Sequence, residues 1–136
     1  MARSTLNILV VEDHPDTLEV FGWFLNELGY RCQLAPTVDL ALGLAHAEKF
    51  DVLITDVWLG KQDGFELVVE LRRRGCLPPR VFSMSAGDDH LSATRSSKAG
   101  CHKHLVKPML SEELGALLQE AGYAGAESWR LESTRR

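Results

Sequence analysis

Residues 6–13 read LNILVVED, a short run of aliphatic side chains that ends in two acids. A run in which nearly every side chain is apolar is typical of a parallel strand buried on both faces. Pro15 follows shortly afterwards, where the first turn of a helix accepts proline. The stretch therefore predicts a buried parallel strand over residues 6–11, whose carboxyl end carries Glu12 and Asp13 and leads into a helix.

The rest of the chain repeats this alternation of apolar runs and helix-period segments. We expect further strands over residues 31–34, 51–55, 80–84 and 102–106, with a loop containing Gly60 and Gly64 after the second of these. We expect helices over residues 15–28, 37–49, 65–74, 88–99 and 111–121, the last capped by Ser111. Strands alternating with helices predict the α/β class: a doubly wound, flavodoxin-like (βα)5 fold, with a five-stranded parallel sheet of order 2-1-3-4-5 and helices on both faces. We expect residues 1–122 to form this domain and residues 123–136 to form a frayed tail.

The composition is that of an ordinary globular chain. Its 136 residues are 45% hydrophobic and 25% charged, and the net charge of −4 argues against a nucleic-acid surface. No apolar run reaches the length of about 20 residues that spans a bilayer, and we read no signal peptide. Cys32, Cys76 and Cys101 match no metal-binding or disulfide pattern. A reducing, cytoplasmic setting is the expected one.

Polar side chains follow several of the predicted strands at their carboxyl ends. Glu12 and Asp13 follow the first strand, Asp56 the third, Ser85 the fourth and Lys107 the fifth. In an open parallel sheet, ligands bind beyond these ends, at the point where the strand order reverses. Because the first and third strands are neighbours in the expected order, the three acids should meet there, flanked by one hydroxyl and one amine.

Each of these residues also has a plainer interpretation. An acid after a strand is often a helix cap, so Asp13 is either a cap or part of the site. An isolated Lys107 would usually be a solvated loop lysine, and His14, which begins a helix, is interpreted as exposed. The convergence of all the strand-end positions favours a shared site over separate caps and loops.

Three carboxylates in one pocket repel one another, and a divalent cation removes that repulsion. Oxygen ligands from Glu12, Asp13 and Asp56 suit Mg²⁺, whereas zinc would call for His or Cys. An ionised Asp56 can then attack a phosphoryl donor and form an aspartyl phosphate. Lys107 and the Ser85 hydroxyl would each cover one phosphoryl oxygen.

This set of motifs resembles the receiver domain of two-component response regulators over about residues 6–121. The resemblance rests on ILVVED at 8–13, ITD at 54–56, DG at 63–64, MSA at 84–86 and KP at 107–108. It implies that Asp56 accepts a phosphoryl group from a histidine kinase or a histidine phosphotransfer protein. It also implies a further Mg²⁺ ligand from the backbone carbonyl of Trp58. Residues 104–108, HLVKP, look most like receivers associated with hybrid histidine kinases.

The resemblance further implies that Ser85 is the switch hydroxyl and Lys107 the phosphate-binding lysine. A downstream protein target would bind the surface of the helix over 88–99, the strand over 102–106 and the helix over 111–121, which is remodelled on phosphorylation. His104 occupies the position of the switch aromatic. It is either a plain edge-strand surface residue or a pH-tuned switch.

Such a domain is a phosphoacceptor rather than an enzyme, with at most slow autodephosphorylation. We expect a monomer or a weak homodimer, with neither nucleic-acid nor membrane partners. A phosphatase of the haloacid dehalogenase type would need a second acid where Trp58 stands, and a flavodoxin would need a Ser-, Thr- and Gly-rich loop where Glu12 and Asp13 stand. A pseudo-receiver, an interaction module that phosphorylation does not regulate, stays open as the alternative.

Overall fold

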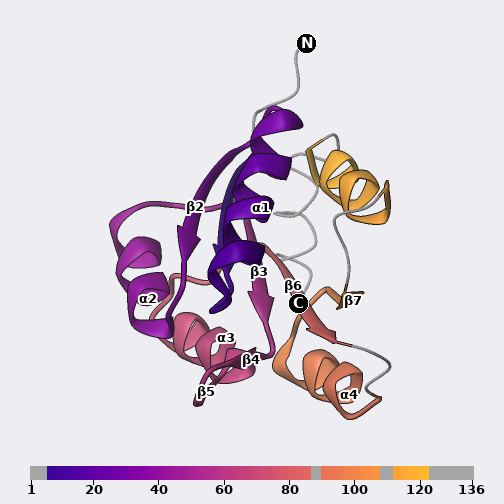
Figure 1. Ribbon diagram of the computed structural model, residues 1–136. Coiled ribbons are helices and arrows are strands. Elements are labelled where there is room, and N and C mark those ends of the chain that lie inside the picture. The colour runs from indigo at the N-terminus through magenta and orange to yellow at the C-terminus, as the bar shows by residue number, and fades with distance from the viewer. Residues whose placement is uncertain (1–5, 87–89, 108–111, 123–136) are drawn as a thin grey trace.

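A computed structural model describes residues 6–86, 90–107 and 112–122 of the chain. Its central sheet consists of five parallel strands (Figure 1): β1 (Asn7–Val11), β2 (Arg31–Ala35), β3 (Val52–Asp56), β6 (Arg80–Ala86) and β7 (Lys103–Lys107). The strand order is β2-β1-β3-β6-β7. This order confirms the predicted 2-1-3-4-5 arrangement of a flavodoxin-like sheet.

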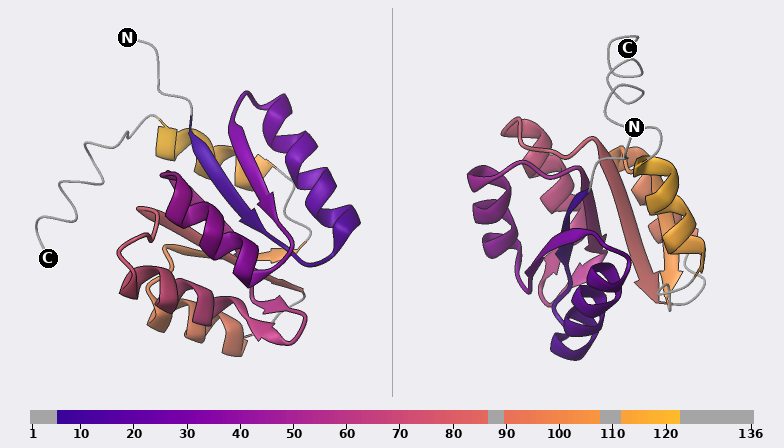
Figure 2. Two further views of the ribbon diagram at one scale, coloured as in Figure 1. Left: turned by 90° about the vertical axis from the view of Figure 1, so that its left-hand side faces the viewer. Right: turned by 90° about the horizontal axis from the view of Figure 1, so that it is seen from above.

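Helices cover both faces of this sheet. They are α1 (Pro15–Glu27), α2 (Val38–Ala47), α3 (Gly64–Arg73), α4 (His90–Ala99) and a last helix over residues 112–122. Figure 2 shows α1 and the 112–122 helix on one face, and α2 and α3 on the other. The predicted doubly wound architecture is therefore confirmed.

Alternate side chains of the strands enter two separate apolar cores. Ile8 and Val10 of β1 belong to the core that α1 and the 112–122 helix complete, whereas Leu9 and Val11 belong to the core under α2 and α3. Successive residues of a strand point to opposite faces, so a strand covered on both sides needs an unbroken apolar run. This is the physical reason for the LVV of residues 9–11, all of which are fully buried.

The predicted loop after the third strand is more ordered than the sequence indicated. Here the chain forms a short antiparallel hairpin, β4 (Trp58–Leu59) and β5 (Gln62–Asp63). Gly60 lies at the first position of its two-residue turn with a φ of +65°, a conformation that glycine adopts without strain. The hairpin extends the chain beyond the carboxyl end of β3 and brings it back to begin α3.

Several helix starts are also clearer than the sequence indicated. Asp13 does not cap α1; the N-cap is the exposed His14, whose ring accepts a hydrogen bond from the backbone N–H of Thr17. Asp63 caps α3 and Thr37 caps α2. The predicted cap at Ser111 and the predicted tail over residues 123–136 lie outside the described residues.

Among the described helices, none has both the length and the apolar character required to cross a membrane.

Candidate functional site

The three strand-end acids meet at one point of the sheet edge. Asp56 is the last residue of β3, and Glu12 and Asp13 directly follow β1, which pairs with β3. One ligand atom from each of the three carboxylates lies within 4.8 Å of the other two. Glu12 and Asp56 are buried, and Asp13 is exposed. The parallel register of β1 and β3 therefore assembles the predicted carboxylate cluster.

Lys107 reaches the same point from β7, two strands away from Asp56. Its Nζ donates to Asp56 Oδ2 at 2.7 Å and to Glu12 Oε1 at 2.6 Å. Because β6 lies between β3 and β7, the long side chain of Lys107 has to cross the end of β6 to make both ion pairs. Lys107 is thus an ion-pair partner in the site and not a solvated loop lysine.

Burial and charge oppose each other at Glu12. Only 1% of its side chain is exposed, and this burial raises the pKa of Glu12 above its ordinary value. Hydrogen bonds from Lys107 and from the backbone N–H of His14 offset part of this effect, while the neighbouring Asp56 charge adds to it. Burial also works against the charge of Lys107, but its bonds to Asp56 and Glu12 outweigh that and raise the pKa of Lys107.

The Asp56 carboxylate is oriented by bonds to both of its oxygens. Lys107 binds Oδ2, and the backbone N–H of Trp58 donates to Oδ1 at 3.2 Å. The backbone below it is equally constrained, since the Thr55 hydroxyl donates to the Asp56 carbonyl oxygen at 3.0 Å. A Cβ at Gly64 would lie 2.0 Å from that same oxygen, so only glycine fits where the hairpin returns past β3.

The hairpin also carries Trp58 and Asp63. The Trp58 side chain is 56% exposed beside the site, and its carbonyl as a metal ligand stays a prediction. Asp63, quoted above only as part of a motif, accepts from the Phe65 N–H at 2.7 Å and pairs with Arg95 of α4. The guanidinium of Arg95 also lies 4.9 Å from the centre of the Phe65 ring. The segment after Asp56 is therefore tied to α4.

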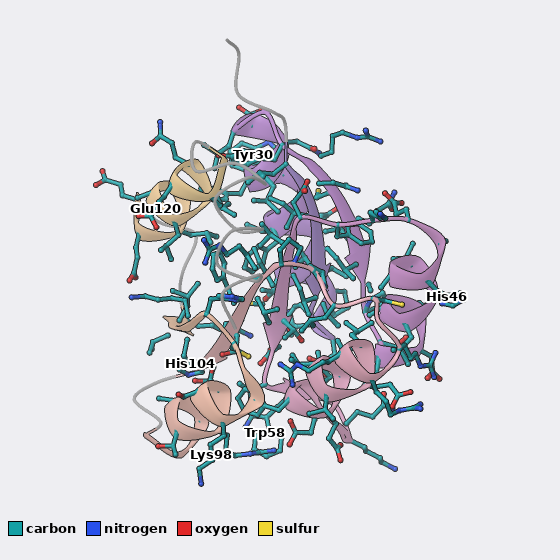
Figure 3. All side chains as sticks on the ribbon, turned by 180° about the vertical axis from the view of Figure 1, so that it is seen from behind. Tyr30, His46, Trp58, Lys98, His104 and Glu120 are labelled. Atoms are coloured by element: carbon teal, nitrogen blue, oxygen red, sulfur yellow. The ribbon has the colours of Figure 1, made fainter. Side chains whose placement is uncertain are left out.

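Ser85 is buried at the end of β6, where its hydroxyl is hydrogen-bonded to Nε2 of His104 at 2.9 Å. The interpretation of His104 as a plain surface residue is wrong, because its ring is half-buried and its Nδ1 lies 2.7 Å from the Ser83 hydroxyl. Figure 3 shows His104 beside α4. Ser83 and its partner Ser96 of α4 were missed by the sequence analysis, since neither residue stands at a strand end.

The site can hold a divalent cation and present an oriented carboxylate to an incoming group. One ammonium faces three carboxylates, which leaves an excess of negative charge that a cation of the Mg²⁺ type would balance. The donors are all oxygens, as Mg²⁺ prefers. No zinc-type combination with His or Cys occurs in the part of the chain that the structure describes.

Comparison with known proteins gives one consistent result. The family described as the response regulator receiver domain matches residues 8–119. A 14.6 kDa protein from the sodA1 3′ region of Leptolyngbya boryana is 33% identical over 118 residues, covering 85% of this chain and 88% of that protein. The virulence sensor protein BvgS of Bordetella bronchiseptica is 32% identical over 90% of this chain, which spans only 10% of BvgS.

The fold is likewise found among solved structures. One matching chain, with a TM-score of 0.79, comes from a co-crystal structure of two Saccharomyces cerevisiae proteins. These are the histidine phosphotransfer signalling protein Ypd1 and the receiver domain of its downstream response regulator Ssk1. The match covers 91% of this chain and 93% of that one at 20% identity, so it concerns the fold alone. A two-component response regulator from Clostridium difficile gives a TM-score of 0.78 at 23% identity, covering 86% of this chain and 95% of that chain.

Proposed function

Because this chain belongs to the response regulator receiver domain family, the phosphoacceptor domains of two-component systems, we propose that Asp56 is its phosphoacceptor. The observation that carries the proposal is the pair of ion contacts of Lys107. This one ammonium lies within hydrogen-bond distance of both Asp56 and Glu12 at the sheet edge where β1 and β3 end. An aspartate held between a lysine and two further acids suits phosphoryl transfer better than any other polar group of the described chain.

The proposed reaction is a direct transfer from a phosphohistidine. A carboxylate oxygen of Asp56 attacks the phosphorus, and the P–O bond forms as the P–N bond of the donor breaks. The electron pair of the broken bond returns to the donor imidazole. Lys107, already bonded to Oδ2, is placed to pair with a phosphoryl oxygen of the product. The backbone N–H of Trp58 donates to Asp56 Oδ1 and so keeps the carboxylate oriented.

Glu12, Asp13 and Asp56 are the residues that would hold Mg²⁺, with the Trp58 carbonyl as a further ligand. Their ligand atoms are close enough together to bind one ion, and the excess negative charge of the cluster favours a divalent cation. When bound, Mg²⁺ supplies charge neutralisation for the carboxylates and for the phosphoryl oxygens. The chain contributes the oriented nucleophile, the Lys107 charge and the buried Glu12 that anchors the cluster.

The proposed partners follow from the family and not from a contact seen in this structure. A histidine kinase or a histidine phosphotransfer protein would donate the phosphoryl group, as expected for a receiver. A downstream protein would bind the surface of α4, β7 and the 112–122 helix once Asp56 is phosphorylated. The proposed domain covers residues 1–122 and behaves as a phosphoacceptor rather than as a turnover enzyme.

Acetyl phosphate labelling tests the acceptor assignment. Intact-protein mass spectrometry should show one phosphoryl adduct on the wild type with Mg²⁺ and none on Asp56→Asn. The control is Asp16→Asn, which makes the same change at an exposed acid of the first turn of α1 and should leave labelling unchanged. Absence of an adduct on the wild type, or an adduct that persists on Asp56→Asn, would refute the proposal and favour a pseudo-receiver.

Tryptophan fluorescence tests the metal assignment. The backbone N–H of Trp58 donates to Asp56, so the indole lies close to the site and should report Mg²⁺ binding as a change in emission. Trp58→Phe should abolish the change, whereas Trp23→Phe on the exposed face of α1 should retain it. A flat titration of the wild type would argue against the metal site.

A further inference from the structure

A continuous row of hydrogen bonds runs from α4 to the end of β6. The Ser96 hydroxyl of α4 lies 2.6 Å from the Ser83 hydroxyl of β6, which lies 2.7 Å from His104 Nδ1. On the other side of the ring, His104 Nε2 lies 2.9 Å from the Ser85 hydroxyl. The row thus joins three elements, and Ser85, at its far end, is the residue that the family resemblance implies as the switch hydroxyl.

The strand geometry makes this bridge possible. Ser83 and Ser85 alternate along β6 and so point to the same face of the sheet, and His104 is the direct register partner of Ser83 on β7. The imidazole can therefore span both hydroxyls with its two nitrogens. Ser83, Ser85 and Ser96 are each at most 2% exposed, so their hydroxyls depend on partners inside the protein.

We propose that Ser83 and Ser96 are positioning residues of the phosphoacceptor site, which hold His104 so that its Nε2 retains the Ser85 hydroxyl until Asp56 is phosphorylated. The proposal rests on the proposed function, because it requires that Asp56 accepts a phosphoryl group. Ser83 lies within β6 just before the MSA motif and Ser96 lies on α4, so neither serine is itself a strand-end residue. It also makes the His104 bond a restraint on switching.

The restraint follows from competition for one hydroxyl group. To bond a phosphoryl oxygen on Asp56, the Ser85 side chain has to turn away from His104 and give up its 2.9 Å contact with Nε2. A lost intramolecular hydrogen bond is a cost to the phosphorylated state, so the unphosphorylated state is favoured. A ring without this bond would oppose switching less.

The same row of hydrogen bonds links Ser85 to α4. The buried side chains described for α4 differ in size from those of α3. Over the part of α4 whose side chains the structure describes, residues 92–99, the buried side chains are small: Ser92, Ser96 and Ala99. The buried side chains of α3 include Phe65, Leu67, Val68 and Leu71. Because these described side chains bury little apolar area, the hydrogen bond between Ser83 and Ser96 is an important contact for this part of α4. Release of Ser85 therefore removes one of the two bonds that hold the His104 ring. The other bond leads through Ser83 to Ser96 of α4, the helix on the proposed output surface.

Beryllofluoride affinity with Mg²⁺, read from Trp58 fluorescence, tests the restraint. His104→Phe keeps an aromatic ring without either nitrogen, and it should bind beryllofluoride about threefold to tenfold more tightly than the wild type. Ser96→Ala, which leaves His104 less firmly held, should tighten binding by a smaller factor. The matched control is Ser92→Ala, which removes another buried hydroxyl one turn earlier on α4 and should leave the affinity unchanged.

A spectroscopic measurement on the wild type complements the variants and does not depend on their folding. The ¹⁵N resonance of His104 Nε2 should shift when beryllofluoride binds, while the resonance of Nδ1, still bonded to Ser83, should change less. Unchanged His104 resonances, or unchanged or weaker binding by His104→Phe, would overturn the inference. Failure of the proposed function would look different, because the wild type itself would then bind no beryllofluoride.

Discussion

Replacement of Lys107 by Met tests most directly how much the ammonium group stabilises the buried carboxylates of the site. Methionine keeps the apolar stem of the side chain and removes the ammonium that binds both Asp56 and Glu12. These carboxylates are 9% and 1% exposed, so the variant leaves two nearly buried acids without their cation. We expect the metal-free variant to be less stable than the wild type at neutral and alkaline pH.

The size of this loss follows from burial. Removal of one partner of a fully buried ion pair costs about 3–5 kcal/mol. Because the Lys107 side chain is itself 27% exposed, water already screens part of the interaction, and we expect about 2 kcal/mol. For a domain of this size that loss lowers the melting temperature by about 8 °C.

The loss should depend on pH in a defined direction. The pKa of Glu12 is raised above 4.5 in the fold, so its protonated form favours folding below that pH, and this contribution disappears as the pH rises through the folded pKa. Without Lys107 that pKa rises further. The deficit of Lys107→Met should therefore be small at about pH 5 and largest at about pH 8.

Thermal unfolding followed by circular dichroism, with a chelator, provides the measurement. Excess Mg²⁺ should recover much of the deficit, since it neutralises the same carboxylates. Lys103→Met, an exposed lysine of the same strand, is the control and should melt close to the wild type. Equal melting of Lys107→Met and the wild type at alkaline pH, or a deficit that grows as the pH falls, would refute the electrostatic account.

Two further substitutions test how the segment after Asp56 is held. Gly64→Ala would place a methyl group 2.0 Å from the Asp56 carbonyl oxygen, so it should destabilise the fold by about 3 kcal/mol or more in chemical denaturation, whereas no loss would show that the hairpin adjusts freely. Arg95→Ala removes the ion pair with Asp63 and the contact with the Phe65 ring, and should cost about 1 kcal/mol. Amide exchange in α4 should then increase, and unchanged exchange would contradict this tie between α4 and the hairpin.

Much of the fold could be predicted because burial dictates local residue choice. The LVV run of residues 9–11 is apolar at every position because both faces of β1 are covered. The alternation of strands and helices predicted the parallel, doubly wound sheet, and the order observed is that of the flavodoxin-like fold. The hairpin at 58–63 escaped prediction because its strands are two residues long, too short for any periodicity to register. The sequence left Asp13 as either the cap of α1 or part of the site, because several side chains near a helix start can accept the same N–H; in the structure His14 is the cap.

The sequence by itself determined which polar side chains stand at the ends of the buried strands, because a strand must end where its apolar run ends. That was enough to bring Glu12, Asp13 and Asp56 together as a candidate site. Only the tertiary structure decided which side chains form hydrogen bonds with one another. Lys107 meets Glu12 across 95 residues of sequence, and His104 bridges Ser83 and Ser85 to bond to two hydroxyls of β6. Such contacts depend on strand register and side-chain rotamers, which are set by packing of the whole domain and leave no local pattern in the chain.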